Sequence, residues 1–411
     1  MTSDRSLLYA SSLLRSLAIG MLGVLIALHV IAHHWSNGLL FAIVGAGLAG
    51  GGLASGLAAF TADHARRAWL SALSALSAAG VVVCAFGPGE GWMLVAAFVG
   101  MLNGMGKDRS AQQVIETAIL PATASASERT FVIARYTMLQ DIGLAVGTLA
   151  AGLPALLGDA SSADGAAATT AALLIAAALL GIGVVLPWFM TSAIETPRPP
   201  VAMRLAPESR RVLVRLCALF SLDSIGGGFI TGALVTYFFI TQYAQPEWII
   251  GALLFTARCA NAVSHLGAAW LAKRIGLVNT MVFTHIPSSL LLVTVGFTGS
   301  FWIAAILYLM RESLVEMDVP TRQSYVMAVV RPEERTFVSA VTSLVRLGGW
   351  AIGALAAGLA MRHVGLAAPL IACAVMKITY DVLLYASFRH LKPPEELPAP
   401  GVTSAPARPG A

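Results

Sequence analysis

The chain has 411 residues, of which 57% are hydrophobic and only 11% are charged. A soluble domain has roughly 25% charged residues, so this composition excludes an ordinary soluble protein of the same size. The net charge of +5 lies in the loops beside apolar runs, which indicates a membrane surface and excludes nucleic acid as the expected partner.

Twelve apolar runs are long enough to cross a membrane. About 20 helical residues span a hydrocarbon core of about 30 Å. Lipid offers no hydrogen-bond partners, so a spanning segment must be a helix or part of a closed barrel. The runs are continuous and do not alternate, which favours helices. In chain order the predicted spans are 7–32, 38–60, 68–87, 92–120, 130–157, 166–190, 211–240, 248–271, 277–297, 301–330, 336–361 and 366–389.

The first run has the position of a signal peptide but not its pattern. Arg15 interrupts the segment that would have to be uncharged, and no cleavage site of small residues follows it. We therefore expect 7–32 to be the first spanning helix.

Basic residues are distributed unevenly between the two sides of the predicted membrane. The loops on the side of the termini hold fifteen Lys and Arg, whereas the opposite loops hold only Arg362. Cytoplasmic loops carry the excess of Lys and Arg, so both termini are predicted to be cytoplasmic. For this multi-pass protein we expect the inner (cell) membrane of a bacterium.

The spans divide into two sets of six. Residues 1–190 are predicted to form an N-terminal six-helix bundle, and residues 211–390 a C-terminal one. Between them, 191–210 is a cytoplasmic linker with several prolines and charges. The tail 391–411 is rich in Pro, Ala and Gly and is predicted to be disordered.

An internal repeat relates the two sets. The pentapeptide Glu-Arg-Thr-Phe-Val at 128–132 recurs at 334–338, and residues 128–153 match 334–359 at 14 of 26 positions, at a shift of 206. The same shift places Gly20 of the first span on Gly226 of the seventh. The halves are therefore predicted to be parallel repeats of six helices each.

Parallel six-helix repeats with a substrate site near the midplane describe the major facilitator superfamily. The chain resembles this superfamily, particularly its bacterial drug and metabolite efflux permeases, also in the segment 317–325 and in the acidic-basic motif 332–335. The resemblance implies an all-α membrane protein, with twelve transmembrane helices in two pseudo-symmetric six-helix bundles. It also implies transport by alternating access.

Two loops resemble a cytoplasmic gating motif of the superfamily. After span 8, residues 272–276 keep the basic residue and the glycine, although Lys273 replaces the acidic residue. After span 2, residues 62–67 keep the acid and the paired arginines but lack the glycine. The resemblance implies gating roles for Asp63, Arg66, Arg67, Glu128, Arg129, Lys273, Arg274, Gly276, Glu334 and Arg335.

Glycines recur in register in spans 5 and 11. In the superfamily, span 5 carries a Gly-rich antiporter motif with a proline after its second glycine; here Thr148 replaces that proline. Small residues let helix backbones approach closely in lipid, so we favour a packing role over an antiport-specific role. These glycines are Gly143, Gly147, Gly152, Gly349, Gly353 and Gly358.

Ionisable side chains inside spanning helices are costly and indicate a transport pathway, a proton relay or a structural ion pair. Residues four apart share a helix face, so span 4 is predicted to carry one polar stripe and span 10 another, both facing a central cavity and titrating. A buried structural ion-pair network is the alternative. The predicted site residues of these spans are Asp108, Arg109, Gln112, Glu116, Arg311, Glu312, Glu316, Asp318 and Arg322.

Spans 1 and 7 add Arg15 and Asp223 to the predicted site. At the shift of 206, the position equivalent to Arg15 lies two residues before Asp223. A charge pair between them is one interpretation, and attraction of an anionic substrate by Arg15 is the other.

The favoured function is secondary active transport, namely proton-coupled efflux of a small organic molecule. The alternative is an uptake symporter or facilitator for an anionic metabolite, and a remote one is a membrane-embedded enzyme or a non-transporting sensor. The sequence has no HExxH, GxSxG or Walker lysine motif, and its cysteines lie singly in apolar runs, so we expect no enzyme activity, cofactor or metal. The expected partners are the substrate, protons and membrane lipid, and a monomer is expected.

Overall fold

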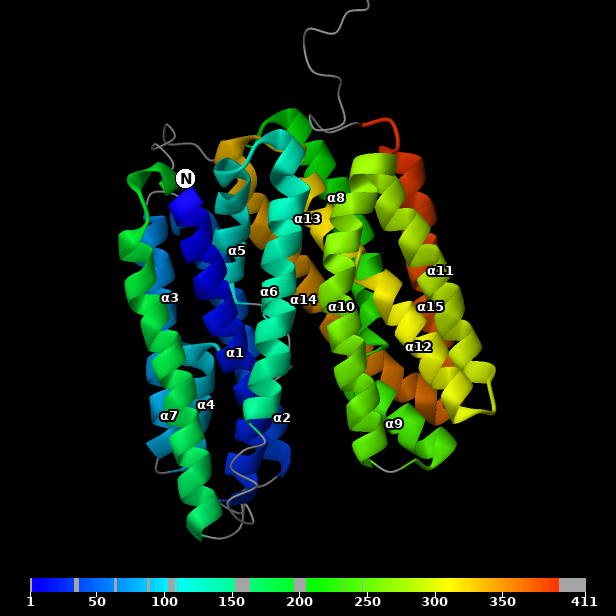
Figure 1. The fold of residues 1–411 in the computed structure, drawn as a ribbon, viewed down its shortest axis with the longest axis horizontal. Coiled ribbons are helices and arrows are strands. Elements are labelled where there is room, and N and C mark those ends of the chain that lie inside the picture. The colour runs from blue at the N-terminus through cyan, green and yellow to red at the C-terminus, as the bar shows by residue number, and fades with distance from the viewer. Residues whose placement is uncertain are drawn as a thin grey trace, which may run out of the picture.

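The computed structural model describes residues 2–32, 37–62, 65–86, 89–102, 108, 110–151, 163–195, 205–230, 232–245 and 247–391. All regular elements within these ranges are helices (Figure 1). The predicted all-α fold is confirmed. Of the predicted linker, 196–204 lie outside the described residues, as do 392–411 of the predicted tail, so the disorder of that tail stays a prediction.

The first half of the chain, here called the N-half, extends through residue 195. Its helices are α1 (Thr2–Ala32), α2 (Asn37–Thr61), α3 (Arg66–Phe86), α4 (Glu90–Gly100), α5 (Ala111–Ile119), η2 (Leu120–Thr123), η3 (Ala126–Glu128), α6 (Arg129–Ala150), α7 (Ala163–Val185), η5 (Leu186–Phe189) and η6 (Ser192–Ile194).

The second half, here called the C-half, begins at residue 205. Its helices are α8 (Pro207–Gly228), α9 (Gly232–Tyr243), α10 (Glu247–Ile275), α11 (Leu277–Phe297), α12 (Phe301–Val315), α13 (Asp318–Ala328), η7 (Pro332–Glu334), α14 (Arg335–His363) and α15 (Ala368–Phe388).

Span 4 is not the continuous helix that the sequence predicted. Helix α4 ends at Gly100, followed by Met101 with a left-handed backbone at φ 54°, and α5 begins only after Ser110. The Ser110 side chain accepts a hydrogen bond from the Gln113 amide, which is the usual cap of a helix N-terminus. Asp108 therefore precedes α5, and the prediction that it shares a helical stripe with Glu116 was wrong.

Span 10 is interrupted as well, between α12 and α13. Pro320 has no N–H, and its ring clashes with the carbonyl four residues earlier, at Glu316, where the helix breaks. Arg311 and Asp318 consequently belong to different helices, and the single stripe predicted for them was wrong. Span 7 breaks after the three glycines that end α8 at Gly228, because consecutive glycines favour helix poorly.

The repeat brings equivalent helices into equivalent contacts: α6 packs on α1, and α14 packs on α8. A Cβ on Gly147 would lie 2.0 Å from the Leu17 carbonyl oxygen, and a Cβ on Gly353 would lie 2.0 Å from that of Ile225. Only glycine permits such close backbone approach, so the contacts support the packing role. Gly143 and Gly349 meet α1 and α8 similarly. Gly152 lies outside the described residues, and the surroundings of Gly358 lie outside what the structure describes.

The same contacts correct the register of the first and seventh spans. Gly20 meets the Leu144 carbonyl, and Gly228, not Gly226, meets the equivalent carbonyl of Trp350. Helices α1 and α8 therefore correspond at a shift of 208, although α6 and α14 correspond at 206. This register makes Arg15 and Asp223 equivalent positions.

Each half has its own apolar core. Among the described residues, two buried clusters draw on the N-half alone and two on the C-half alone, while Ala59, Val114 and Ala340 form a small cluster across the halves. Figure 1 shows the halves side by side, with the N-terminus and the end of α15 at one end of the molecule, here called the terminus end. The face away from it is the opposite end.

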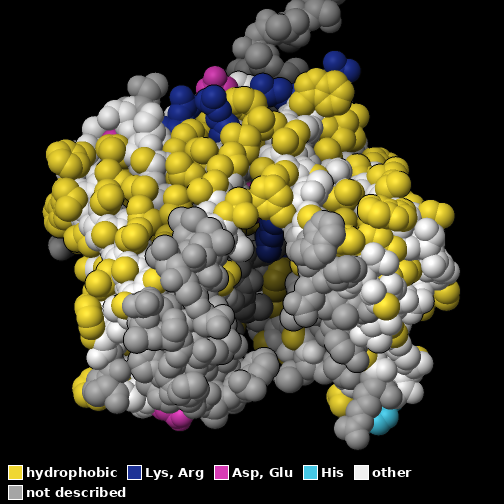
Figure 2. Space-filling model, turned by 60° about the horizontal axis from the view of Figure 1, so that its bottom comes forward, with side chains coloured by type: hydrophobic (Ala, Val, Ile, Leu, Met, Phe, Trp, Pro, Cys, Tyr) yellow, Lys and Arg dark blue, Asp and Glu magenta, His cyan; other side chains and the backbone are white. Residues whose placement is uncertain are grey.

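The outer surface is apolar, as a lipid-facing surface must be. Phe297, Val263 and Trp302 are each about 70% exposed, and apolar side chains dominate the described part of the face in Figure 2. Six helices within the described ranges are individually long and apolar enough to cross a membrane: Ser3–Ile26, Arg66–Phe86, Ala167–Phe189, Leu277–Phe297, Pro332–Met361 and Ala368–Phe388.

Candidate substrate and proton site

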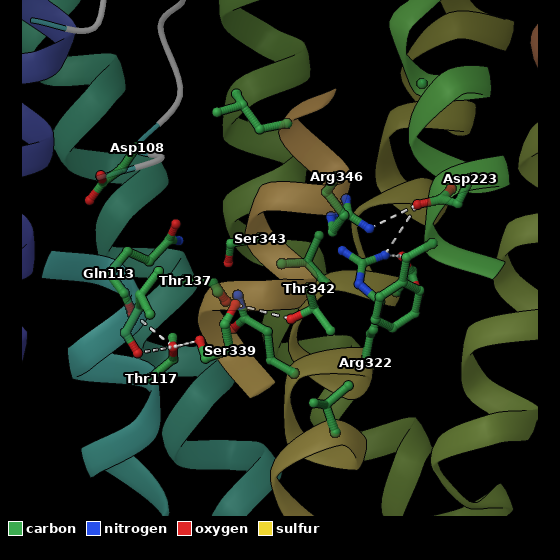
Figure 3. Close-up of a pocket in the computed structure, with 18 of the residues that line it drawn as sticks. Asp108, Gln113, Thr117, Thr137, Asp223, Arg322, Ser339, Thr342, Ser343 and Arg346 are labelled. Atoms are coloured by element: carbon green, nitrogen blue, oxygen red, sulfur yellow. Dashed lines mark hydrogen bonds and ion pairs between the residues drawn. The ribbon is translucent and has the colours of Figure 1, made fainter. Parts of the chain in front are cut away.

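A cavity of about 230 Å³ lies between the two halves. Residues of α2, α5 and α6 line it from the N-half, and residues of α8 and of α10 through α15 line it from the C-half. Figure 3 shows Asp108 and Gln113 on one wall, facing Asp223, Arg322 and Arg346 on the other. The cavity is thus bounded by ionisable groups from both repeats.

Hydrogen bonds between the halves close the cavity toward the terminus end. Their residues lie on the short helices α5 and α13, which lead into loops of that end, or near the starts of α3, α6 and α14. On the opposite end, Figure 2 shows a hollow between the halves, with one patch of basic atoms at its inner edge. The closing pairs are Thr117 and Ser339 at 3.1 Å, Thr130 and Ser324 at 2.8 Å, and Arg66 and Thr336 at 3.2 Å.

Arg15 of α1 organises the ionisable groups of the N-half. Its Nη1 and Nη2 donate to the two carboxylate oxygens of Glu116 at 2.7 and 2.6 Å, and its Nε donates to Asp108 Oδ2 at 2.8 Å. Glu116 also accepts from the Tyr136 hydroxyl at 2.6 Å and from the Ser11 hydroxyl at 3.1 Å. Because Glu116 is fully buried, these donors replace the water that an ionised carboxylate would otherwise need.

Asp108 differs from Glu116 because it lines the cavity. Besides Arg15, it accepts hydrogen bonds from Gln140 Nε2 at 3.2 Å and from the Ser110 amide at 3.0 Å. One arginine therefore serves two carboxylates, of which only Asp108 faces the cavity.

Asp223 of α8 occupies the equivalent place in the C-half. Lys377 Nζ donates to its Oδ1 at 2.8 Å, and Arg346 Nη1 donates to its Oδ2 at 2.9 Å. Arg322 Nη1 lies 3.6 Å from the same Oδ2 and also pairs with Asp318 one turn away on α13. The proposed pair between Arg15 and Asp223 is not formed, since each has partners within its own half.

The two halves carry the same ion pair with the charges exchanged. Arg15 and Asp223 are equivalent through the contacts of α1 and α8, and Glu116 and Arg322 are equivalent at the shift of 206. The N-half thus sets a base on its first helix against an acid on α5, whereas the C-half sets an acid against a base on α13. The repeat conserves the position of the pair and inverts its polarity.

Two histidines of the C-half, absent from the predicted site, lie within hydrogen-bond distance of carboxylates. His285 Nδ1 lies 2.9 Å from Asp381 Oδ1, and its Nε2 lies 3.1 Å from Lys377 Nζ. His265 Nε2 lies 2.8 Å from Asp141 Oδ2 in the opposite half, and both residues line the cavity. The contact between Asp141 and His265 is therefore a polar link across the two repeats.

The remaining predicted site residues are distributed unequally. Glu316 lines the cavity. Gln112 donates to Ser74 at 3.4 Å inside the N-half, and Arg311 pairs with its neighbour Glu312, which also accepts from Asn261 at 2.9 Å. These three do not line the cavity, and Arg109 lies outside the described residues.

The residues predicted for gating lie at the terminus end, apart from Asp63, which is outside the described residues. Glu195 joins both arginines of the first motif: it accepts from the Arg66 amide at 2.7 Å and from Arg67 Nε at 3.2 Å. Glu334 accepts from the Ala206 amide at 2.7 Å.

Arg335 Nε donates to the Met327 carbonyl, and Glu128 accepts from Ser125. Arg129 is buried. Lys273 lies over the ring of Phe131 and Arg274 over that of Trp270, and Gly276, at φ 89°, directly precedes α11. Their gating role stays a prediction.

Several residues of the site were missed by the sequence reasoning. Lys377 and Asp381 are both buried and bound into the C-half cluster. Arg346 and Asp141 were visible as ionisable residues in spans, yet no spacing tied them to a partner. Tyr136 gave no signal, because a tyrosine in an apolar helix is ordinary.

Comparison with known proteins agrees with this architecture. The family model described as the Major Facilitator Superfamily matches residues 8–354. An uncharacterized membrane protein of Saccharomyces cerevisiae is 22% identical over 422 residues, covering 94% of both chains. The solved structure of the human organic anion transporter MFSD10 (TETRAN) is 16% identical, with a TM-score of 0.71, over 93% of this chain and 99% of that one.

The solved structure of the E. coli fucose:proton symporter FucP is 14% identical, with a TM-score of 0.72, over 93% of this chain and 98% of that one. At these identities the structural likeness shows the fold. Because the family model covers most of the chain, this protein belongs to the major facilitator superfamily. It is a multi-pass membrane protein with twelve transmembrane helices in two pseudo-symmetric bundles, and its structural neighbours are transporters.

Proposed function

We propose that this protein is a proton-coupled secondary transporter that moves a small organic molecule by alternating access. The observation that carries the proposal is the cavity between the repeats, which is closed at the terminus end and lined by acids and bases from both halves. The cavity volume of about 230 Å³ is below the ~300–1,000 Å³ of drug-sized pockets, so a small substrate is favoured.

Alternating access requires contacts between the halves that can exchange. The polar closing contacts here are single hydrogen bonds, each worth about 1 kcal/mol, and the apolar cluster across the halves is small, so these contacts can exchange. Parallel repeats supply the motion, since one half can rock against the other about a fixed midplane site.

Asp108 and Asp318 are the proposed proton-binding residues. Asp108 faces the cavity and shares Arg15 with Glu116, so a proton on Asp108 leaves Arg15 fully paired with Glu116. The Oδ1 atom of Asp318 has no hydrogen-bond partner among the described residues, although the residue is buried. A proton there relieves an unsatisfied oxygen, while Arg322 keeps Asp223 nearby.

Topology and direction complete the proposal. The Lys and Arg distribution supports cytoplasmic termini in a bacterial cell membrane, so the cavity would open to the outside. The motif resemblance to efflux permeases supports export, in which substrate and protons exchange as antiport. A monomer with a bundle at 1–190, a linker at 191–210 and a bundle at 211–390 suffices for this cycle.

The test is transport in proteoliposomes under an imposed pH gradient, with a pH-sensitive dye inside reporting proton movement as candidate organic acids and amines are added. The wild type should move protons when its substrate is added, and Asp108→Asn and Asp318→Asn should each uncouple substrate from proton. A wild type that transports but ignores the gradient refutes proton coupling. If both variants respond like the wild type, the coupling site lies elsewhere.

A second mode, uptake of an anion together with a proton, is favoured by one observation: an incompletely paired arginine, Arg346, on the cavity wall. Export by exchange requires substrate and proton to compete, whereas cotransport requires them to bind together. The sign of the proton movement on substrate addition separates the two modes.

A further inference from the structure

Arg346 is the cavity arginine with unused donors. Its only hydrogen bond among the described residues runs from Nη1 to Asp223, and its side chain is 20% exposed on the cavity wall. Arg15 and Arg322, by comparison, have 5% and 8% exposed side chains and pair with two carboxylates each. The free edge of a guanidinium is a fork of N–H groups that matches a carboxylate or another oxyanion.

Asp223 does not depend on Arg346 for neutralisation. Lys377 binds its other oxygen at 2.8 Å, and Arg322 lies 3.6 Å away. Arg346 can therefore turn toward a ligand without leaving a buried charge unpaired, which would cost about 3–5 kcal/mol. Asp223 therefore stays paired with a basic group when Arg346 turns away.

The surroundings of Arg346 hold its guanidinium beside the cavity. Phe220 lies beneath two guanidinium groups, with its ring centroid 5.9 Å from Arg346 Cζ and 5.6 Å from Arg322 Cζ. Ser343 and Trp350 line the cavity on the same helix, one turn before and one turn after Arg346. Figure 3 shows Ser343 and Arg346 on the wall opposite Asp108. An anionic group at Arg346 thus has a hydroxyl and an aromatic ring available for the rest of the molecule.

The charge balance of this wall links anion binding to a proton. The buried or cavity-lining ionisable groups of the C-half around Asp318 comprise five acids and four Lys or Arg, so the ionised wall has no spare positive charge. An anion arriving alone would leave the wall more negative, whereas a proton on a carboxylate restores the balance. The groups are Asp223, His285, Arg311, Glu312, Glu316, Asp318, Arg322, Arg346, Lys377 and Asp381 of the C-half, with Asp141 and His265 as a separate pair across the halves.

We propose that the transported molecule is a small organic anion, that its acid group binds the open edge of Arg346, and that it enters the cavity together with a proton. The proposal rests on the transport function proposed above and names its substrate class. It takes the second of the two modes given there, in which the anion and a proton bind together.

Equilibrium binding to purified protein tests the proposal without any gradient. Methanesulfonate and benzenesulfonate are suitable probes because they stay anionic throughout the working pH range, so any pH dependence belongs to the protein. Benzenesulfonamide is the neutral match and benzylammonium the cationic match. Displacement calorimetry and the quenching of tryptophan fluorescence report binding.

The wild type should bind a sulfonate, and the affinity should rise as pH falls, by up to about tenfold for each pH unit if one proton binds with the anion. Arg346→Gln should weaken binding by roughly tenfold or more, because a charged hydrogen-bond partner is lost. Arg346→Lys should recover part of the affinity, since it keeps the charge but not the fork. Asp318→Asn should bind with a flatter pH dependence.

Arg135→Gln is the matched control, because Arg135 lies on the repeat-equivalent helix α6 but is exposed and does not line the cavity. It should bind like the wild type, and its elution profile shows whether the loss of an arginine by itself disturbs the fold. The proposal is overturned if neither sulfonate binds the wild type, if Arg346→Gln binds as tightly as the control, or if benzylammonium binds and the sulfonates do not. Proton-independent binding overturns the cotransport part.

Failure here and failure of the transport proposal are distinguishable. Sulfonate binding that disappears in Arg346→Gln stands even if the proteoliposomes ignore a pH gradient, in which case the proton-coupled function is wrong. Gradient-driven transport with no role for Arg346 leaves that function standing and removes the anion site.

Discussion

The buried cluster of Arg15 gives the sharpest stability prediction. Arg15 donates three hydrogen bonds of 2.6–2.8 Å to Asp108 and Glu116, and none of the three side chains is more than 5% exposed. Arg15→Met would leave two carboxylates without their cation. Breaking a buried pair in this way costs about 3–5 kcal/mol of the free energy of unfolding.

Glu116→Gln should cost less, about 1–3 kcal/mol, because the amide keeps the shape and Arg15 retains Asp108. The double variant Arg15→Met with Glu116→Leu replaces charge by apolar volume. It should be more stable than the sum of the two single losses predicts, by about 0.5–3 kcal/mol, because neither charge is left alone.

Unfolding of the purified protein in mixed micelles of increasing SDS content, followed by tryptophan fluorescence, measures these differences. The deficit of Arg15→Met should shrink as pH falls, because protons neutralise the carboxylates that have lost Arg15. If Arg15→Met loses less free energy of unfolding than Glu116→Gln, or if its loss grows as pH falls, the assignment of Arg15 as the shared cation is refuted.

Three further predictions concern packing, the link between the halves, and topology. Gly147→Ala and Gly353→Ala should each destabilise the fold strongly in the same SDS titration, while Gly181→Ala, with nothing within 4 Å of a new Cβ, should be neutral; equal effects would contradict the helix contacts. His265→Gln should weaken the link to Asp141 by about 1 kcal/mol and shift the balance of cavity orientations about fivefold, seen in distances between spin labels on the two halves; an unchanged distribution would deny the link a role. A reporter active only in the periplasm, fused after α15, should stay silent, and strong signal would invert the topology.

The stripe predicted for span 4 illustrates where local reasoning failed. Spacing alone placed Asp108 and Glu116 on one helix face, but Ser110 caps a new helix and Asp108 accepts from the Ser110 amide. Both acids still meet at Arg15, although by a different route. The sequence therefore grouped two acids that do lie together, although they do not share a helix face.

Span 10 failed for a reason that was visible in the chain. Pro320 stands where a continuous helix would need the Glu316 carbonyl to accept a hydrogen bond, and the helix breaks there. The apolar run predicts one span because only its full length reaches across a membrane. A proline inside such a run is tolerated in lipid when neighbouring helices satisfy the freed groups, so length gave no warning.

The sequence by itself determined the class of protein. Charge content, the length of the apolar runs and the repeat at 128–153 and 334–359 are local or periodic properties, and lipid leaves few folds that satisfy them. The sequence also indicates candidate site residues, because an ionisable side chain in a membrane span is costly and is retained only for a structural or functional role. Span length, charge content and the cost of a buried charge act on single segments, so they can be evaluated without knowing how the helices pack.

Only the tertiary structure decided which charges meet. Arg15 lies about one hundred residues from Glu116, and Lys377 lies 154 residues from Asp223, so no spacing rule connects them. The pairing follows from the register of α1 on α6 and of α8 on α14, which close glycine contacts set to within one residue. A shift of 208 in place of 206 makes Arg15 and Asp223 equivalent and inverts the charges of the two halves. This register exists only in the packed structure. A charged side chain in the membrane pairs with whichever partner the neighbouring helix places beside it, and the packing of the two helices decides which partner that is.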